Sequence, residues 1–274
     1  MPNNADKKTS ITEAFDFIAA SYNHTALRFF PFCADRLVRI LEPKPSDKIL
    51  DVATGTGVVA IAIAQAVKAR GRVLAVDLSK NMLEQAEQSI QKMGLTNIDL
   101  FTMDAEALDF KNNYFDAVTC SFGLFFMPSM STALTEWRRV TKPGGTVLFT
   151  SFTEDAFQPM VEDFIKDIVE FGVPMDESSM VARRLYDRDL CQGLMLESGY
   201  QDVEVKQIQV GYHLRDAEEW WQVLWNSGFR RYLMQLSAAQ LPKFRQLHLE
   251  RITKQVSQRG LWLDVSVWVT TGHA

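Results

Sequence analysis

The chain has 274 residues, of which 47% are hydrophobic, 11% aromatic and 23% charged, with 14 Gly and 9 Pro. These values are typical of a globular protein, so a disordered chain, a collagen-like chain and a disulfide scaffold are excluded. The formal net charge of −5 argues against nucleic acid as the main partner, because surfaces that bind nucleic acid are usually basic.

The sequence gives no sign of a membrane helix, a secretory signal or a metal site. Its longest near-continuous apolar run, residues 58–67, is about half of the roughly 20 residues that a membrane helix requires. The first ten residues lack the apolar segment of a signal peptide. Cys33, Cys120 and Cys191 are isolated and form no metal-ligand spacing. We therefore expect a cytoplasmic protein without integral membrane association and without a bound metal.

The first half of the chain predicts a helical cap followed by alternating strands and helices. The apolar spacing over residues 11–41 predicts helix, which Pro31 should break or kink into two or three short pieces. Strands are predicted at residues 48–52, 72–76, 98–102, 115–121 and 146–152, and helices at 58–68, 79–93 and 132–140. Such interleaving indicates βαβ units, and so a parallel sheet with helices on both faces.

The second half predicts helices at residues 157–171 and 187–197, a strand at 203–210, helix-forming sequence over 216–258 and a last strand at 263–269. We accordingly divide the chain into five parts. They are an N-terminal helical cap (1–45), a ligand-binding core (46–153), the end of the core with lid-like helices and the sixth strand (154–214), a helical insertion (215–260) and the last strand (261–274).

A glycine-rich turn follows the first predicted strand. Gly55 and Gly57 stand where this strand turns into a helix, so the backbone there can approach a ligand closely. Asp77 ends the second strand at about the 20-residue spacing from which an acid reaches a ribose diol. Gly55, Gly57 and Ala60 also satisfy the G-x-G-x-x-A pattern, so these residues alone also fit a dinucleotide-dependent dehydrogenase.

Two further acids favour another ligand. Asp51 precedes the glycines, where its carboxylate would repel a pyrophosphate but can bind an ammonium group. Asp104 ends the third strand and can bond the edge of an adenine. For Asp51, Asp77 and Asp104 the simpler alternative is that each caps the turn after its strand. Acids after three successive strands nevertheless suit a ligand with an ammonium group, a ribose and a base but no phosphate. S-adenosylmethionine is such a ligand.

The segments DVATGTG, VLAVDLSKNML, MDAEAL, FDAVTCSFGLFFMP and RRVTKPGG occur in this order. They resemble the successive motifs of class I S-adenosylmethionine-dependent methyltransferases, especially the group similar to ubiquinone/menaquinone-biosynthesis methyltransferases. The resemblance implies an α/β fold: a Rossmann-like, seven-stranded, mostly parallel sheet with helices on both faces, an N-terminal helical cap, a helical insertion before the last strand, and that last strand antiparallel.

The resemblance also assigns cofactor contacts by position. The methionine end would be held by Asp51, Gly55 and Gly57, the ribose by Asp77, and the amino-acid moiety by Ser121. Leu78 and Met82 would flank the adenine, Asp104 and Ala105 would read its edge, and Tyr22 would contact the methionine carboxylate. Ala53 would also adjoin the cofactor, although many relatives have Gly at this position.

The reaction implied is in-line methyl transfer to an oxygen, carbon or sulfur atom of a small, partly apolar acceptor. Tyr22 and His24 are the candidate catalytic residues if a base is needed, although a lone His more often lies on the surface. The tetrapeptide Ser121-Phe122-Gly123-Leu124 differs from the Asn-Pro-Pro-Tyr type, which argues against amide or adenine N-methylation.

Several alternatives stay open at this point. Trp221, Leu224 and Trp225 have the spacing of a core-facing stripe, and less favourably of an acceptor pocket shared with the 122–126 loop. The Arg183-Arg184 pair suits either an acidic acceptor or solvent. The protein could bind S-adenosylmethionine without transferring methyl, as a pericyclic catalyst or a sensor, or less favourably be an NAD-dependent dehydrogenase. The insertion could also serve a homodimer.

Overall fold

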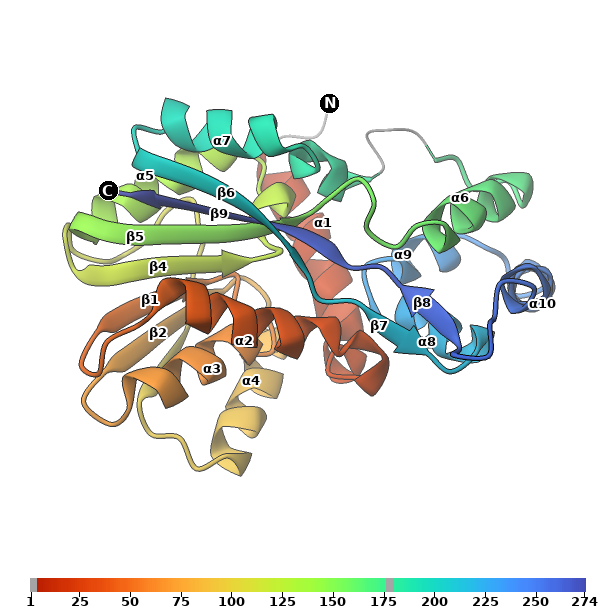
Figure 1. Ribbon diagram of the computed structural model, residues 1–274, viewed down its shortest axis with the longest axis horizontal. Helices are drawn as coiled ribbons and strands as arrows, with labels where there is room; N and C mark the ends of the chain where they lie inside the picture. The colour runs from red at the N-terminus through yellow and green to blue at the C-terminus, as the bar shows by residue number, and fades with distance from the viewer. Residues whose placement is uncertain (1–3, 176–179) are drawn as a thin grey trace.

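A computed structural model describes residues 4–175 and 180–274. Its centre is a seven-stranded sheet in the order β3-β2-β1-β4-β5-β9-β6 (Figure 1). Strands β1 to β5 pair in parallel, whereas β9 is antiparallel to both β5 and β6. The strands are β1 (Lys48–Val52), β2 (Arg72–Asp77), β3 (Ile98–Thr102), β4 (Phe115–Ser121), β5 (Thr141–Phe152), β6 (Gln201–Gln209) and β9 (Ser266–His273). The predicted fold class is confirmed.

Helices cover both faces of this sheet, α2, α3 and α4 on one side and α5 and α7 on the other (Figure 1). Their bounds are α2 (Phe29–Leu41), α3 (Val58–Val67), α4 (Lys80–Lys92), α5 (Met130–Val140) and α7 (Arg188–Glu197). Helix α1 (Asn4–Ile18) lies apart from these layers and crosses the end of the sheet at which the parallel strands finish (Figure 1).

The central strands are buried on both faces, as their near-continuous apolar sequences require. In β1, Ile49, Leu50 and Val52 are all 0% exposed. The pairing register places Asp51 beside Ala75 of β2 and Thr119 of β4. The fold therefore buries a carboxyl group in the middle of the sheet, one residue before β1 ends.

The N-terminal prediction is wrong in two details. Helix α1 begins at Asn4 rather than at residue 11, and it leads through two 3₁₀ turns, Ala19–Ser21 and Thr25–Leu27, into α2. Pro31 does not break a helix, because it is the third residue of α2, in the first turn, where a backbone N–H needs no partner within the helix.

The predicted last strand is in fact two strands. Strand β8 (Leu261–Leu263) pairs with β7 (Tyr212–Leu214), and the chain then joins the main sheet as β9. At the break, the Asp264 carboxylate accepts hydrogen bonds from the backbone N–H and hydroxyl of Ser266 and from the amide of Gln209. Asp264 thus uses its side chain to hold a bend instead of continuing the strand.

Between β7 and β8 the chain forms α8 (Ala217–Asn226), α9 (Arg230–Leu233) and α10 (Gln240–Thr253), so the helix-forming sequence over 216–258 gives three separate helices. They pack with α6 (Met160–Glu170) at one end of the molecule (Figure 1). In the described ranges 4–175 and 180–274, no helix combines the length and the apolar character needed to cross a bilayer.

Candidate functional site

The turn between β1 and α3 contains three residues with a positive φ: Ala53 (51°), Gly55 (55°) and Gly57 (82°). A Cβ atom on Gly55 would meet no heavy atom within 4 Å, so the turn leaves open space on that side. A Cβ atom on Gly57 would lie 3.0 Å from the Cβ atom of Ala86. Gly57 therefore allows α3 and α4 to pack closely, whereas Gly55 faces free space.

Ala53 is accommodated by the glycine opposite it. The left-handed conformation costs a residue with a Cβ atom roughly 1–2 kcal/mol. A Cβ atom on Gly123 would lie only 2.7 Å from the Cβ atom of Ala53 and 2.8 Å from the Sγ atom of Cys120. The methyl group of Ala53 thus occupies room that exists because residue 123 has no side chain.

Asp51 is a buried carboxyl group, 1% exposed, at the end of β1. Its two oxygens accept hydrogen bonds from the hydroxyl groups of Thr54 (2.6 Å) and Thr119 (2.7 Å). Burial raises the pKa of Asp51 to about 6, although both hydroxyl groups act in the opposite direction. Because the partners in these two hydrogen bonds are neutral, a cationic group of a ligand would stabilise the ionised form.

Asp77 joins the ends of β1 and β2. It accepts hydrogen bonds from the backbone N–H groups of Gly55 (2.8 Å) and Ser79 (2.9 Å). Burial raises the pKa of Asp77, and these N–H groups oppose the shift. Ser79 in turn caps α4, since its hydroxyl oxygen accepts from the N–H of Met82 at 3.0 Å. One carboxylate therefore fixes the glycine turn and the start of α4 in relation to each other.

A third acidic segment follows β3. Asp104 accepts from the N–H of Glu106 at 2.9 Å, and Glu106 accepts from the N–H of Ser129 at 2.6 Å. Lys8 of α1 forms ion pairs with both carboxylates, its Nζ atom lying 2.6 Å from Oδ2 of Asp104. The backbone carbonyl of Ala105, between the two acids, accepts from the indole N–H of Trp137 at 3.1 Å.

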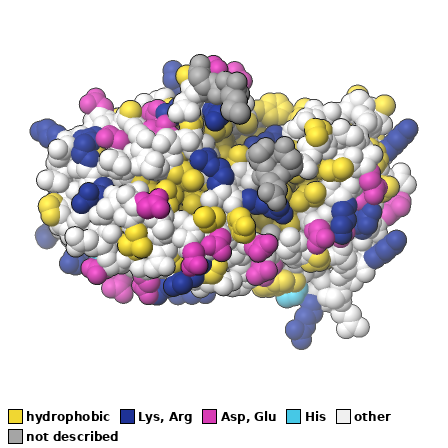
Figure 2. Space-filling view, turned by 90° about the horizontal axis from the view of Figure 1, so that it is seen from above, with side chains coloured by type: hydrophobic (Ala, Val, Ile, Leu, Met, Phe, Trp, Pro, Cys, Tyr) yellow, Lys and Arg dark blue, Asp and Glu magenta, His cyan; other side chains and the backbone are white. Residues whose placement is uncertain are grey.

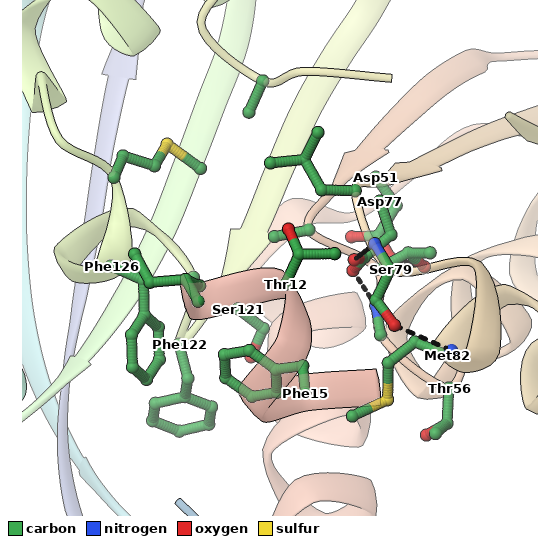
Figure 3. A pocket seen from close by; sticks show the side chains of 18 of the residues that line it. Thr12, Phe15, Asp51, Thr56, Asp77, Ser79, Met82, Ser121, Phe122 and Phe126 are labelled. Carbon is green, nitrogen blue, oxygen red and sulfur yellow. Dashed lines mark hydrogen bonds between the residues drawn. The ribbon is translucent and has the colours of Figure 1, made fainter. Parts of the chain in front are cut away.

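These three segments surround one cavity of about 1130 Å³, part of which is open to solvent (Figure 3). Most residues predicted to contact the cofactor line it, namely Tyr22, Asp51, Ala53, Gly55, Asp77, Leu78, Met82, Asp104, Ala105 and Ser121. Gly57 and His24 are not among the lining residues, whereas Thr12, Phe15, Phe122 and Phe126 are.

The two candidate catalytic residues are placed differently. Tyr22 lies within the cavity wall, with its ring 5.1 Å from that of Phe30 and 6.1 Å from that of Phe15. Burial and the nearby Asp77 raise the pKa of Tyr22, so the phenol keeps its proton at neutral pH. His24 is exposed, and its Nδ1 atom accepts from the N–H of Ala26, so it caps a 3₁₀ turn. This position gives no support to His24 as a base.

Four aromatic side chains line the cavity beside the acids and form an aromatic wall: Phe15, Phe30, Phe122 and Phe126. The sequence did not assign this wall to the cofactor cavity. Phe122 has a φ of 55°, which is unusual for a bulky residue. Its ring stacks on that of Phe152, with the ring centroids 4.3 Å apart and an angle of 16° between the ring planes. The hydroxyl groups of Ser121 and Thr150 form a hydrogen bond, and the Thr150 oxygen also accepts from the backbone N–H of Phe122. Phe126 meets Phe15 of α1 edge to face at 5.0 Å.

One face of helix α1 lines the cavity; three of the four residues on this face lie within the predicted helical segment 11–41, but none was assigned to the cavity. Lys8, Ile11, Thr12 and Phe15 all line the cavity. Their i, i+3, i+4 and i+7 spacing is that of one helix face. This spacing could have indicated that the helix has a face directed at the cavity, but the polar composition of residues 4–10 hides the start of the helix.

The helices of the insertion meet α6 around a buried polar network. The indole N–H of Trp220 donates to Nε2 of His248 at 2.9 Å, so Nδ1 of this ring carries the proton and donates to Asp167 at 2.7 Å. Arg251 forms an ion pair with the other oxygen of Asp167. Burial lowers the pKa of His248 although Asp167 opposes the shift, so this imidazole is neutral. The network holds α6, α8 and α10 together.

Trp221 and Leu224 belong to the core of the insertion, as the favoured interpretation predicted, whereas Trp225 is only partly buried. Trp220 is 0% and Trp221 5% exposed. Arg184, one of the two arginines left open, donates to the backbone carbonyls of Phe125 (2.9 Å) and Met127 (2.7 Å). It thus supports the loop after β4 that carries part of the aromatic wall.

A family model described as the ubiE/COQ5 methyltransferase family matches residues 3–214. The chain belongs to this family. A demethylmenaquinone methyltransferase from Geobacillus kaustophilus is 32% identical over 220 residues, which are 75% of this chain and 94% of that protein. Aklanonic acid methyltransferase DauC from Streptomyces is 34% identical over 144 residues, 53% of this chain and 66% of that protein. A solved SAM-dependent methyltransferase from Aquifex aeolicus shares the fold, with a TM-score of 0.52 at 13% identity over 89% of this chain and 91% of that one.

The chain is thus an S-adenosylmethionine-dependent methyltransferase that acts on a small molecule. The cavity of this ubiE/COQ5 family member suits that cofactor. Gly55 leaves space that a Cβ atom would fill, and Asp51 offers a buried carboxylate without a cationic partner in its two side-chain hydrogen bonds. A dinucleotide, by contrast, would bring a pyrophosphate toward the glycine turn beside Asp51, where like charges repel.

Proposed function

We propose that Asp51 binds the methionine ammonium of S-adenosylmethionine, Asp77 the ribose hydroxyls and Asp104 the adenine edge. The observation that carries this proposal is that these three acids, from the ends of three adjacent strands, line a single cavity. The other proposed contacts are Ala53 and Gly55 at the glycine turn, Leu78, Met82 and Ala105 around the adenine, and Ser121 at the amino-acid moiety. Gly57 does not line the cavity, and we propose that it acts indirectly, by letting the turn pack closely against Ala86 of α4.

We further propose that Tyr22 is a hydrogen-bond donor toward the methionine carboxylate rather than a base. Its raised pKa keeps the phenol protonated. When bound, S-adenosylmethionine supplies a methyl group on a positively charged sulfur. The chain's contribution to the transfer is to hold the acceptor in line with this group and to exclude water, which can supply much of the acceleration.

The acceptor that we propose is a small, partly apolar molecule methylated at oxygen, carbon or sulfur. Rings of Phe15, Phe30, Phe122 and Phe126 line the cavity beside the acids. Figure 2 shows hydrophobic side chains gathered around a hollow near the middle of one face, with basic side chains beside them. Demethylmenaquinone and aklanonic acid, named for two relatives, are the acceptors to test first.

The remaining proposals concern the binding partners, the oligomeric state and the location of the protein in the cell. We propose that the enzyme acts in the cytoplasm on small molecules and not on nucleic acid, in line with its net charge of −5. We also propose a homodimer formed through the insertion, which exposes Met234 (51%) and Leu247 (38%). Analytical ultracentrifugation tests the dimer, and a Met234→Lys, Leu247→Lys double variant should then sediment as a monomer.

Calorimetric titration tests the cofactor site. Wild-type protein is titrated with S-adenosylmethionine, S-adenosylhomocysteine and NADH, and the titration is repeated on Asp77→Ala and on a control, Asp109→Ala, whose side chain is exposed. We expect the first two ligands to bind wild type and the control, and Asp77→Ala to lose binding. Binding of NADH alone would contradict the proposal. Tight binding without conversion of S-adenosylmethionine, with any acceptor offered, would instead favour a sensor or a pericyclic catalyst.

A further inference from the structure

Helix α1 forms one long wall of the cofactor cavity. Lys8 and Phe15 mark the two ends of its lining face, with Ile11 and Thr12 between them. In Figure 3, Thr12 and Phe15 come from α1, and Asp77 and Ser79 come from the turn after β2. A ligand that fills the cavity is consequently enclosed between α1 and the ends of the strands.

The first end of α1 is tied to the segment after β3. Lys8 forms ion pairs with Asp104 and Glu106, whose side chains are 29% and 7% exposed, while that of Lys8 is 23% exposed. Burial acts to lower the pKa of Lys8, but the hydrogen bonds to the two carboxylates outweigh it and raise the pKa. The ammonium group therefore stays charged and shared between two acids.

The second end of α1 is tied to the segment after β2. Asp16 accepts from the hydroxyl group of Ser79 at 2.5 Å and from the N–H of Asn81 at 3.4 Å. The amide of Asn81 returns a bond to the backbone carbonyl of Asp16 at 3.3 Å. Ser79 also donates its N–H to Asp77. Each end of α1 is thus attached to a turn that carries one of the proposed cofactor acids.

The two attachments differ in how readily they can open. Asp16 bonds neutral groups at the start of α4, which the cap of that helix already holds in place. Lys8 is held by charged hydrogen bonds to Asp104, whose side chain is partly exposed, and to Glu106, whose side chain is buried, and salt weakens ion pairs that reach the surface. The Lys8 end is therefore the more salt-sensitive of the two attachments.

We propose that Lys8 is a positioning residue for the cofactor, which holds Asp104 and Glu106 in place and keeps α1 closed over the adenine end once the cofactor has entered. This inference rests on the proposed role of Asp104. Asp104 keeps one oxygen on Lys8 and the other on the N–H of Glu106, and each oxygen retains a free lone pair for the adenine amino group. Lys8 and the adenine can accordingly bind Asp104 together.

The dissociation rate of S-adenosylhomocysteine from the full chain tests the proposal. The rate is measured by stopped-flow fluorescence at low and high salt for wild type, Lys8→Met, Lys8→Arg and a control, Lys7→Met, whose side chain is exposed. We expect Lys8→Met to dissociate about tenfold faster, corresponding to about 1.4 kcal/mol, and to lose the salt dependence seen for wild type. Lys8→Arg should retain most of the slow dissociation, and Lys7→Met all of it.

Three results would overturn the proposal. A wild-type dissociation rate in Lys8→Met would show that this attachment does not retain the cofactor. Tighter binding by Lys8→Met would show that Lys8 competes with the adenine for Asp104. If Lys8→Met proves poorly folded in a thermal melt, Lys8→Arg decides, and fast dissociation that is insensitive to salt then counts against the ion pairs. Failure of wild type to bind S-adenosylhomocysteine at all would instead contradict the proposed function.

Discussion

The two ends of the molecule are built in different ways. At the cofactor cavity, the acids lie at or just after the ends of β1, β2 and β3, and each has one partner close to it in sequence, as Asp77 has Ser79, beside partners from other segments such as Thr119 and Lys8. At the insertion, the polar groups of Trp220, His248 and Asp167 come from three helices and meet only because those helices pack together. Local turns therefore contribute to the first site, whereas the second depends on tertiary packing alone.

This difference predicts where each end is sensitive. A change in one of the three cavity acids should alter ligand binding with little loss of stability, because the buried sheet beneath them is independent of the ligand. A change in the buried network of the insertion should alter stability first. The three predictions below test this contrast, in order of decreasing expected effect.

The largest effect is expected for His248→Leu. The substitution removes the acceptor of the Trp220 indole N–H and leaves the buried Asp167 carboxylate with Arg251 alone. Leaving a buried hydrogen-bonding group without its partner costs about 1–3 kcal/mol, and more for a charged group such as Asp167. We expect urea denaturation to show a loss of about 3 kcal/mol in the free energy of unfolding.

For the same variant, S-adenosylhomocysteine should bind the folded protein as it binds wild type, because the network lies outside the cofactor cavity. His213→Leu, at an exposed ring, serves as the control. Equal losses in cofactor affinity and in stability for His248→Leu would erase the contrast between the two ends.

A smaller effect is expected from pH. The pKa of Asp51 is raised to about 6 by burial, and the proposed bond to the methionine ammonium requires its ionised form. Protonation as the pH falls through 6 therefore removes the bond, and at pH 5 the affinity should be about tenfold weaker than at pH 8. Calorimetry at both pH values measures this change, and Asp51→Asn should bind weakly at each. An affinity that stays constant in wild type would refute the role given to Asp51.

The smallest effect is expected for Ala53→Gly. Glycine adopts a φ of 51° without strain, although it gains more freedom in the unfolded chain. We expect a net gain of about 0.5 kcal/mol in the free energy of unfolding, read from thermal melts, with unchanged affinity for S-adenosylhomocysteine. Gly123→Ala, which would press a new Cβ atom against that of Ala53, should be destabilising. A loss of stability in Ala53→Gly would mean that the methyl contact matters more than the backbone strain.

The same contrast explains what the sequence could predict. The β1–β5 core follows from alternating apolar segments, and the places of Asp51, Asp77 and Asp104 follow from strand ends. The polar start of α1, with Lys8, was missed, and periodicity alone does not show that the helix face of Ile11, Thr12 and Phe15 covers the cavity. The ring of Phe122 depends on a strained backbone that no periodicity reveals. The partners of His248 lie 28 and 81 residues away, beyond any local pattern.

The short pairing of β7 with β8 has a consequence for how this architecture can diversify. Tyr212 lies opposite Leu263 and Leu214 opposite Leu261, so the insertion leaves the sheet and returns to it at a single narrow neck. A segment whose two ends are side by side can be lengthened, shortened or exchanged without moving the strands that precede and follow it. A chimaera joined at the neck would therefore exchange the whole insertion while leaving the cofactor cavity, whose lining residues all lie before β5, unchanged.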